Sequence, residues 1–238
     1  MSIAVKERPI LFSGPMVRAI LDGRKTQTRR IVKAKDSDPE RCIILRTLMA
    51  NVNEWRFQGG RWFGIDGYDT LVFADCPYGA VGDRLWVRET WTPDHADFYP
   101  NFPICYRADF GPEYDRENGK VFSSEQNAWF PFRWRPSIHM PRRASRISLE
   151  IAGVRVERLN DISEEDARAE GVAKMKRDPA SSHQWLFEPV FGCDHPSGTL
   201  GNARECFESG WNKINGPGSW SANPWVWVIE FKRQESAQ

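Results

Sequence analysis

The segment "GRKTQTRR" (residues 23–30) lies where the sequence changes from a helical to an extended pattern. Before it, "PILFSGPMVRAILDG" (residues 9–23) has the pattern of a short apolar strand followed by a helix, which Ser13 is expected to cap. Gly23 is expected to end that helix in a left-handed conformation. After it, "KTQTRRIV" alternates and contains β-branched residues, as a strand does. Lys25 is therefore predicted to lie in the turn between a helix and a strand.

The second half of the chain contains a long extended segment followed by a helix. "SRISLEIAGVRVERL" (residues 145–159) is typical of a long strand or a hairpin, with a bulge or bend at Gly153. "DISEEDARAEGV" (residues 161–172) predicts a helix, because Ser163 followed by Asp166 resembles a capping box and acids occupy the first turn. This is the clearest helix signal in the sequence.

Three further segments complete the predicted fold. "GDRLWVRETW" (residues 82–91) indicates a turn and a strand, "NARECFESGWNKI" (202–214) an amphipathic helix, and "PWVWVIEF" (224–231) a final alternating strand. Strands and helices follow one another without a regular βαβ repeat. We therefore predict the α+β class, with a small mixed β-barrel that the last strand closes.

The chain of 238 residues is expected to form one domain with two large insertions. The first, residues 34–81, contains the strand-like pieces "RCIILRTL" (41–48) and "TLVFADC" (70–76). The second, residues 92–135, is predicted to be mostly loop around a short strand, "ICYRAD", because Pro, Gly and Asp recur in it.

Composition excludes several classes of protein. The sequence contains five cysteines, an odd number, and no CxxC pair, so neither a disulfide framework nor a zinc knuckle is indicated. Cys193 and His195 have a CxH spacing, but two candidate ligands alone do not indicate a metal site. We expect no metal and no other cofactor. No run approaches eighteen apolar residues and no signal peptide is indicated, so we expect a cytoplasmic protein without membrane contact. The oligomeric state stays open.

Two windows concentrate positive charge although the net charge is only +1. Residues 24–35 contain six cations and residues 133–146 contain five arginines, and neither window contains an acid. In the second window Trp134 and His139 stand between the arginines, as in surfaces that stack on bases and bind phosphates. A nucleoside, a nucleotide or RNA is therefore the expected partner. The alternative is a pair of solvated faces whose acids arrive through folding.

The first window also offers a reactive pair. A lysine among arginines loses its proton more easily, and a neutral amine can activate a nearby threonine hydroxyl. Positions i and i+3 of an ideal strand face opposite sides, so Lys25 and Thr28 can meet only if Lys25 lies in the bend after Gly23. The alternative is that the threonine is there for its β-branched shape.

The order of three of these segments resembles the ASCH domain family, whose fold is related to the RNA-binding PUA domains. They are "GRKTQTRR" after a short helix, "GDRLWVRE" in the middle, and the acidic "DISEEDARAEG" helix. Over the full length, "WRPSIHMPRRASRI" (residues 134–147) is similar to prophage-encoded ASCH proteins. The resemblance to the minimal domain covers somewhat under half of the chain and implies a PUA-like mixed barrel with flanking helices.

The resemblance also implies an activity. Small bacterial ASCH proteins include an N(4)-acetylcytidine amidohydrolase, and its catalytic lysine, threonine and glutamate match Lys25, Thr28 and Glu170. The implied roles are a base, a nucleophile and a group that orients or charges the lysine, without a metal. Arg30 matches an arginine that holds the substrate or the oxyanion. Further candidate substrate contacts are Arg24, Trp86, Arg88, Glu89, Arg135 and His139.

Each candidate also has a structural interpretation. Glu170 can be a solvated charge near a helix end, Glu89 can pair with Arg88 along a strand, Trp86 can belong to the core, and His139 can be structural. Two other functions stay open as well: a non-catalytic module that binds RNA or modified nucleic acid, and a ribonuclease.

Overall fold

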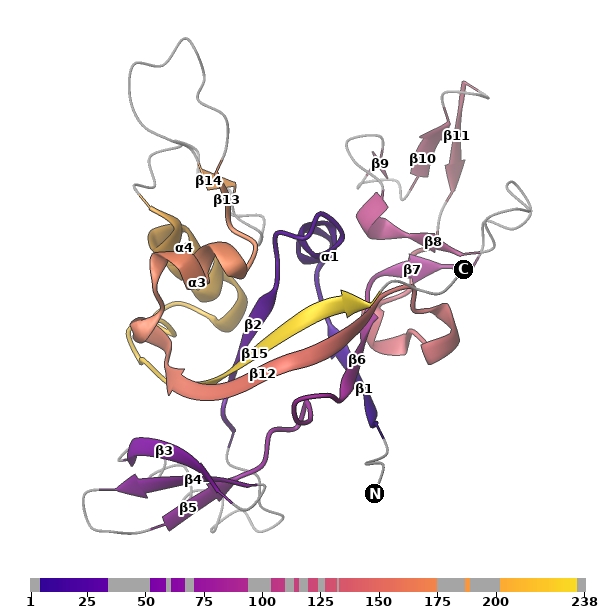
Figure 1. Ribbon diagram of the computed structural model, residues 1–238. Coiled ribbons are helices and arrows are strands. Elements are labelled where there is room, and N and C mark those ends of the chain that lie inside the picture. Colours follow the sequence, from indigo (N-terminus) through magenta and orange to yellow (C-terminus); the bar gives the residue numbers. More distant parts are fainter. Residues whose placement is uncertain are drawn as a thin grey trace, which may run out of the picture.

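The protein, described here from a computed structural model, is built around a five-stranded mixed sheet (Figure 1). The strand order is β1-β6-β12-β15-β2, with β1 and β6 parallel and the other neighbours antiparallel. The strands are β1 (Glu7–Leu11), β2 (Gln27–Ile31), β6 (Arg84–Arg88), β12 (Ser148–Arg158) and β15 (Trp225–Gln234). The structure describes residues 5–33, 52–58, 61–66, 71–93, 104–109, 114–115, 120–123, 127–131, 133–174, 187–188 and 202–234.

The helices and this sheet confirm the α+β class. β1 and β2 occupy the two edges, and no pairing between described strands joins them, so the described sheet is open and the predicted barrel is not confirmed. The two longest strands, β12 and β15, pair along their full length and bend together (Figure 1). Their register shifts between Ile151 and Gly153, where a bulge or bend was predicted.

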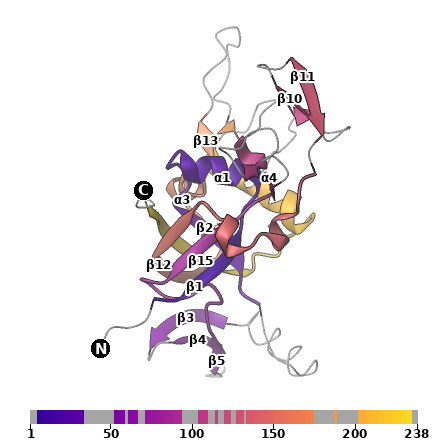
Figure 2. The ribbon, with the colours of Figure 1, turned by 90° about the vertical axis from the view of Figure 1, so that its right-hand side faces the viewer.

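Helix α1 (Gly14–Leu21) connects β1 to β2 and lies over one face of the sheet (Figure 1, Figure 2). Its buried residues are Met16, Val17, Ala19 and Ile20. Gly23 follows with φ of +73°, the left-handed conformation that the sequence predicted for the end of this helix. Ser13 is the N-cap residue, but its side chain makes no capping hydrogen bond, so this part of the prediction is wrong.

Helices α3 (Glu164–Ala169) and α4 (Ala203–Asn215) pack against each other. The predicted cap of α3 is present, since Ser163 Oγ accepts a hydrogen bond of 3.0 Å from the Asp166 backbone N–H. The Glu164 carboxylate accepts bonds of 3.1 and 3.0 Å from the first two backbone N–H groups of α4. An acid of one helix therefore satisfies the N-terminus of the other and fixes the two together.

The first insertion forms a separate three-stranded sheet that packs on the main one. Its strands are β3 (Val52–Gln58), β4 (Arg61–Asp66) and β5 (Leu71–Ala74), while the predicted strand at 41–48 lies outside the described residues. Trp55 and Trp62 make edge-to-face contacts with Trp225 and Trp227 of β15, with ring centroids 6.3 and 5.9 Å apart. This insertion therefore lies against the main sheet, on the side away from α1 (Figure 1, Figure 2).

The second insertion contains more strand than predicted. Its described strands are β7 (Trp91–Thr92), β8 (Cys105–Tyr106), β9 (Tyr114–Asp115), β10 (Lys120–Ser123) and β11 (Ala128–Pro131). Single turns of 3₁₀ helix lie between β8 and β12. They are η1 (Arg107–Asp109), η2 (Ser137–His139) and η3 (Arg142–Ala144).

Three short elements follow β12. They are η4 (Leu159–Asp161) and the paired strands β13 (Ala173–Lys174) and β14 (Phe187–Glu188).

No helix in the described part of the chain is long and apolar enough to cross a membrane. Cys76 and Cys105 form no disulfide within the described part of the chain.

Candidate active site

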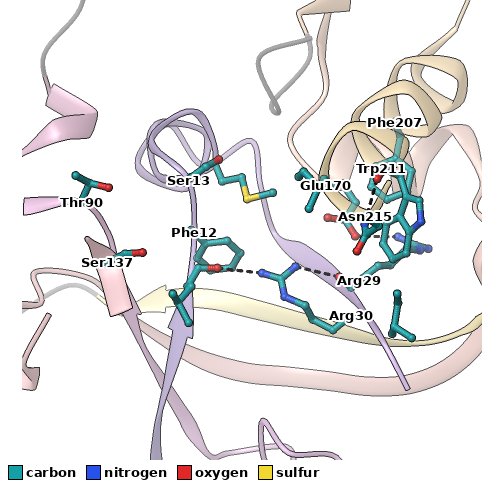
Figure 3. Close-up of a pocket in the computed structure, with 14 residues that line it drawn as sticks. Phe12, Ser13, Arg29, Arg30, Thr90, Ser137, Glu170, Phe207, Trp211 and Asn215 are labelled. Carbon is teal, nitrogen blue, oxygen red and sulfur yellow. Dashed lines mark hydrogen bonds and ion pairs between the residues drawn. The ribbon is translucent and has the colours of Figure 1, made fainter. Parts of the chain in front are cut away.

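A cavity of about 550 Å³ lies between the start of α1, strand β2, the end of α3 and one side of α4 (Figure 3). Figure 3 shows Arg30 between Phe12 and Arg29, with Thr90 and Ser137 on the side away from Trp211. The wall of the cavity is partly apolar and partly polar. The apolar residues are Leu11, Phe12, Met16, Ile31, Phe207, Trp211 and Ile214, and the polar ones are Ser13, Arg29, Arg30, Thr90, Ser137, Glu170 and Asn215.

Lys25 and Glu170 form a buried ion pair at the edge of this cavity. Lys25 Nζ donates to Glu170 Oε2 over 2.6 Å and to the Glu170 carbonyl oxygen over 2.9 Å. The two side chains are 0% and 2% exposed, and the two residues also form a β-bridge. The turn at Gly23 places Lys25 there, because Lys25 N–H still bonds to the Ala19 carbonyl at the end of α1. The predicted pairing of these residues is therefore present.

The surroundings of Lys25 weaken its hold on a proton. Burial lowers the pKa of the Lys25 ammonium, Glu170 opposes this effect, and the neighbouring Arg30 and Arg29 charges lower the pKa further. The net shift of the Lys25 pKa is downward, because the buried ammonium loses its hydration and faces two like charges. A lysine in this state can release its proton and act as a base.

Glu170 is held from its other side by Arg29. Arg29 Nη1 donates to Glu170 Oε1 over 3.3 Å, while Nη2 donates to Asp166 over 2.9 Å and also to Glu157. The Arg29 side chain is fully buried. The Glu170 carboxylate thus contacts one cation at each oxygen, and its orientation is fixed.

Thr28 is connected to this pair indirectly. Its Oγ1 accepts a hydrogen bond of 2.7 Å from Arg30 Nη1, and Arg30 also donates to the carbonyls of Arg29 and Leu11, each over 3.0 Å. The Phe12 ring lies 5.6 Å from Lys25 Nζ and 5.4 Å from the Arg30 guanidinium carbon. Within the described part of the chain, no hydrogen bond joins Lys25 to Thr28. Both are buried behind the cavity wall.

The predicted contacts on β6 and directly after it do not line the cavity. Trp86 is only 8% exposed, and the Arg88 guanidinium covers its ring at 4.6 Å. Glu89 is buried and accepts two hydrogen bonds of 2.9 and 3.1 Å from Arg146, so the alternative of a strand pair with Arg88 is wrong. Burial raises the pKa of the Glu89 carboxyl, and Arg146 opposes that rise. None of Trp86, Arg88 and Glu89 lines the cavity.

The remaining predicted contacts lie around the cavity without lining it. Arg24 donates to the Gly171 carbonyl over 2.9 Å and pairs with Asp22, so it fastens the turn beside the Lys25–Glu170 pair. Arg135 and His139 are exposed and flank Ser137, which does line the cavity. These two are therefore in reach only of a ligand that extends beyond the cavity.

The sequence did not point to Arg29 or to the wall that α4 contributes. Phe207, Trp211, Ile214 and Asn215 line the cavity from α4, which the sequence predicted only as an amphipathic helix. A cavity wall and a core face have the same helical period, so periodicity alone does not separate them. Ile214, at the end of that helix, is apolar but exposed in the fold, which the sequence alone does not show.

The described residues contain no group of three side chains that could hold a metal, and Cys193 and His195 lie outside them. Comparisons of the chain with models of protein families, with curated proteins and with solved structures find no match.

Proposed function

We propose that this protein is an ASCH-type, PUA-like amidohydrolase of the cytoplasm that removes an acyl group from a modified base such as N(4)-acetylcytidine. The observation that carries the proposal is the buried Lys25–Glu170 pair at the edge of a cavity of about 550 Å³. Ligand pockets for small molecules have about this volume. The curved, open sheet of β12 and β15 is compatible with part of a PUA-like barrel.

The wall of the cavity suits a planar, partly polar ligand. Phe12, Phe207 and Trp211 offer aromatic surface for a base, and Asn215 offers an amide. The Asn215 side-chain nitrogen donates to the Trp211 carbonyl, which leaves the amide oxygen free to accept from an exocyclic N–H of the ligand. These contacts support a nucleobase rather than a purely apolar ligand.

In the proposed reaction Thr28 is the nucleophile and Lys25 the base. The Thr28 oxygen accepts from Arg30, so its own hydrogen remains for donation to neutral Lys25. The oxygen attacks the acetyl carbonyl, and Arg30 stabilises the oxyanion. The Lys25 ammonium then protonates the departing N4 nitrogen, which releases cytidine and leaves an acetyl ester on Thr28. Water, activated by Lys25, hydrolyses that ester to acetate and restores the hydroxyl.

Thr28 is buried behind Arg30, so the reaction requires the Arg30 side chain to move when the acyl group enters. Arg30 is held only by neutral acceptors in the described structure, namely Thr28 Oγ1 and two carbonyls. Such bonds are weaker than an ion pair with a carboxylate. Exchange of these acceptors for a substrate oxygen is therefore energetically accessible.

The direct test is acetate release from N(4)-acetylcytidine, offered as the nucleoside and within RNA, with a chelator present. We expect release in chelator, loss of it in Lys25→Ala, and retention in Lys232→Ala, which removes an exposed lysine on β15. Folded wild-type protein that releases no acetate from either substrate contradicts the amidohydrolase proposal.

A non-catalytic RNA-binding module is the second candidate. It is favoured by the exposed arginines and the exposed histidine of the segment that borders the cavity at Ser137: Arg133, Arg135, His139, Arg142 and Arg143. For such a module, Arg135→Gln weakens RNA binding, affinity falls steeply with salt, and Lys25→Ala changes little. Shortening of the RNA in the same assay identifies a ribonuclease instead.

A further inference from the structure

We infer that Arg29 is a positioning residue that holds the second carboxylate oxygen of Glu170 and keeps that carboxylate paired when Lys25 gives up its proton. The inference rests on the proposed function, in which Lys25 must become neutral to accept the Thr28 proton. It concerns a residue that touches neither the acyl group nor the attacking hydroxyl.

An isolated buried pair is a poor source of a neutral lysine. Removing the charge of one partner leaves the other buried and uncompensated, which is strongly unfavourable, so the carboxylate holds the proton on the amine. Here Glu170 Oε2 faces Lys25 and Oε1 faces Arg29. A guanidinium stays protonated throughout the accessible pH range, so Glu170 keeps a cationic partner in both states of Lys25.

A second arginine, Arg155, shares two of the three acids that pair with Arg29. Arg155 donates to Glu157 over 3.0 Å and to both Asp166 oxygens over 3.2 Å, and it also pairs with Glu230. Asp166 and Glu157 therefore each lie between two arginines. Asp166 and Glu157, which Arg155 holds in place, orient Arg29 and leave its Nη1 directed at Glu170.

The charged groups that face Lys25 all favour this interpretation. Glu170 comes from the end of α3, Arg29 and Arg30 come from β2, and the Phe12 ring covers the remaining side. Glu170 is the one acid in contact with Lys25 among the described residues. The link from Arg29 to Glu170 therefore decides how strongly Glu170 can retain the Lys25 proton.

The test is an NMR titration of Lys25 in the full chain, labelled with ¹³C at the lysine side chains and assigned by loss of the signal in Lys25→Met. In Arg29→Gln we expect the Lys25 pKa to rise by about one unit or more, and in Arg29→Lys to return toward wild type. Arg233→Gln removes an exposed cation from β15 and is the matched control. A change of the Lys25 pKa in Arg29→Gln no larger than in Arg233→Gln overturns the inference.

Kinetics give a second readout that a purely structural role would not move. In Arg29→Gln the acid limb of the kcat profile moves to higher pH, and at pH values below that limb kcat falls about tenfold for each pH unit by which the limb moves. The kcat recovers in alkali. A uniform loss of kcat at all pH values overturns the inference. Wild-type protein that releases no acetate, but whose Lys25 pKa responds to Arg29→Gln as expected, contradicts the proposed function and supports the pairing of Glu170 by Arg29.

If Arg29→Gln does not fold, Glu157→Gln tests the same link. It removes one acid from Arg29, so more of the guanidinium charge acts on Glu170 and the Lys25 pKa falls. An unchanged or raised Lys25 pKa in this variant overturns the inference.

Discussion

Lys25 Nζ and Glu170 Oε2 lie 2.6 Å apart although 145 residues separate them in the chain. The contact joins the turn after α1 to the end of α3, and it is sealed from solvent. Buried ion pairs of this kind stabilise folds poorly, since desolvation offsets their attraction. In the proposed function the pair lies beside the cavity to supply a base, and not to stabilise the fold.

Removal of either side chain of this pair should lower the free energy of unfolding. Removal of both should lower it by less than the sum of the two single effects. Lys25→Met is expected to lower the free energy of unfolding by about 2 kcal/mol, because the Glu170 carboxylate loses a charged hydrogen-bond donor and keeps Arg29 alone. Urea unfolding of Lys25→Met, Glu170→Gln and the double variant measures the coupling. Lys232→Met is the control and should change the stability little. Strict additivity would show that the two side chains are not coupled.

Thr28 should be required for its hydroxyl and not for its shape. Thr28→Ala is expected to abolish acetate release, and Thr28→Ser to retain a measurable part of it, because serine keeps the nucleophile. Thr26→Ala changes an exposed threonine two residues away and should leave turnover unchanged. Equal activity of Thr28→Ala and Thr26→Ala would remove Thr28 from the mechanism.

The apolar end of α4 should affect substrate affinity more than stability. Ile214 lines the cavity and is 55% exposed, so Ile214→Ala costs little folding energy. We expect KM to rise about three- to tenfold through lost contact with the base, with kcat nearly unchanged. Val81→Ala, which trims an exposed apolar residue away from the cavity, is the control. An unchanged KM would mean that the ligand does not reach this wall.

Stability should fall in acid through Asp166. Burial raises the pKa of this carboxyl, but Arg29, Gln27 and Arg155 outweigh burial, and the net pKa lies below its ordinary value. The stabilisation is therefore present above the ordinary pKa of about 3.9 and is lost as pH falls through the lower, folded-state pKa. Asp166→Asn should be less stable than wild type near neutral pH, and the difference should shrink in acid. Denaturant titrations at several pH values test this, and a constant difference would contradict it.

The sequence predicted those elements whose structure depends on residues close together in the chain. The turn at Gly23, the cap of α3 by Ser163 and the buried face of α4 are set by residues within one or two turns of each other. The pairing of Lys25 with Glu170 was expected from the resemblance to the ASCH family, because nothing in the charge pattern joins residues so far apart.

The errors concern partners that only folding brings together. For Glu89 neither interpretation of the sequence holds, since it does not line the cavity and its partner is not the adjacent Arg88 but Arg146, in the segment before β12. Arg29 appeared as one more cation in a basic window, and its three acids come from β12 and α3. A charge run in a sequence does not say which of its members are neutralised in the fold.

The edge-to-face tryptophan contacts between the first insertion and β15 limit how far this chain can be shortened. A variant that lacks the first insertion would leave the Trp225 and Trp227 rings facing water on a β-strand. Such a truncated chain is an aggregation hazard. The added strands are therefore a structural support of the sheet, and a smaller functional version requires polar replacements at both tryptophans.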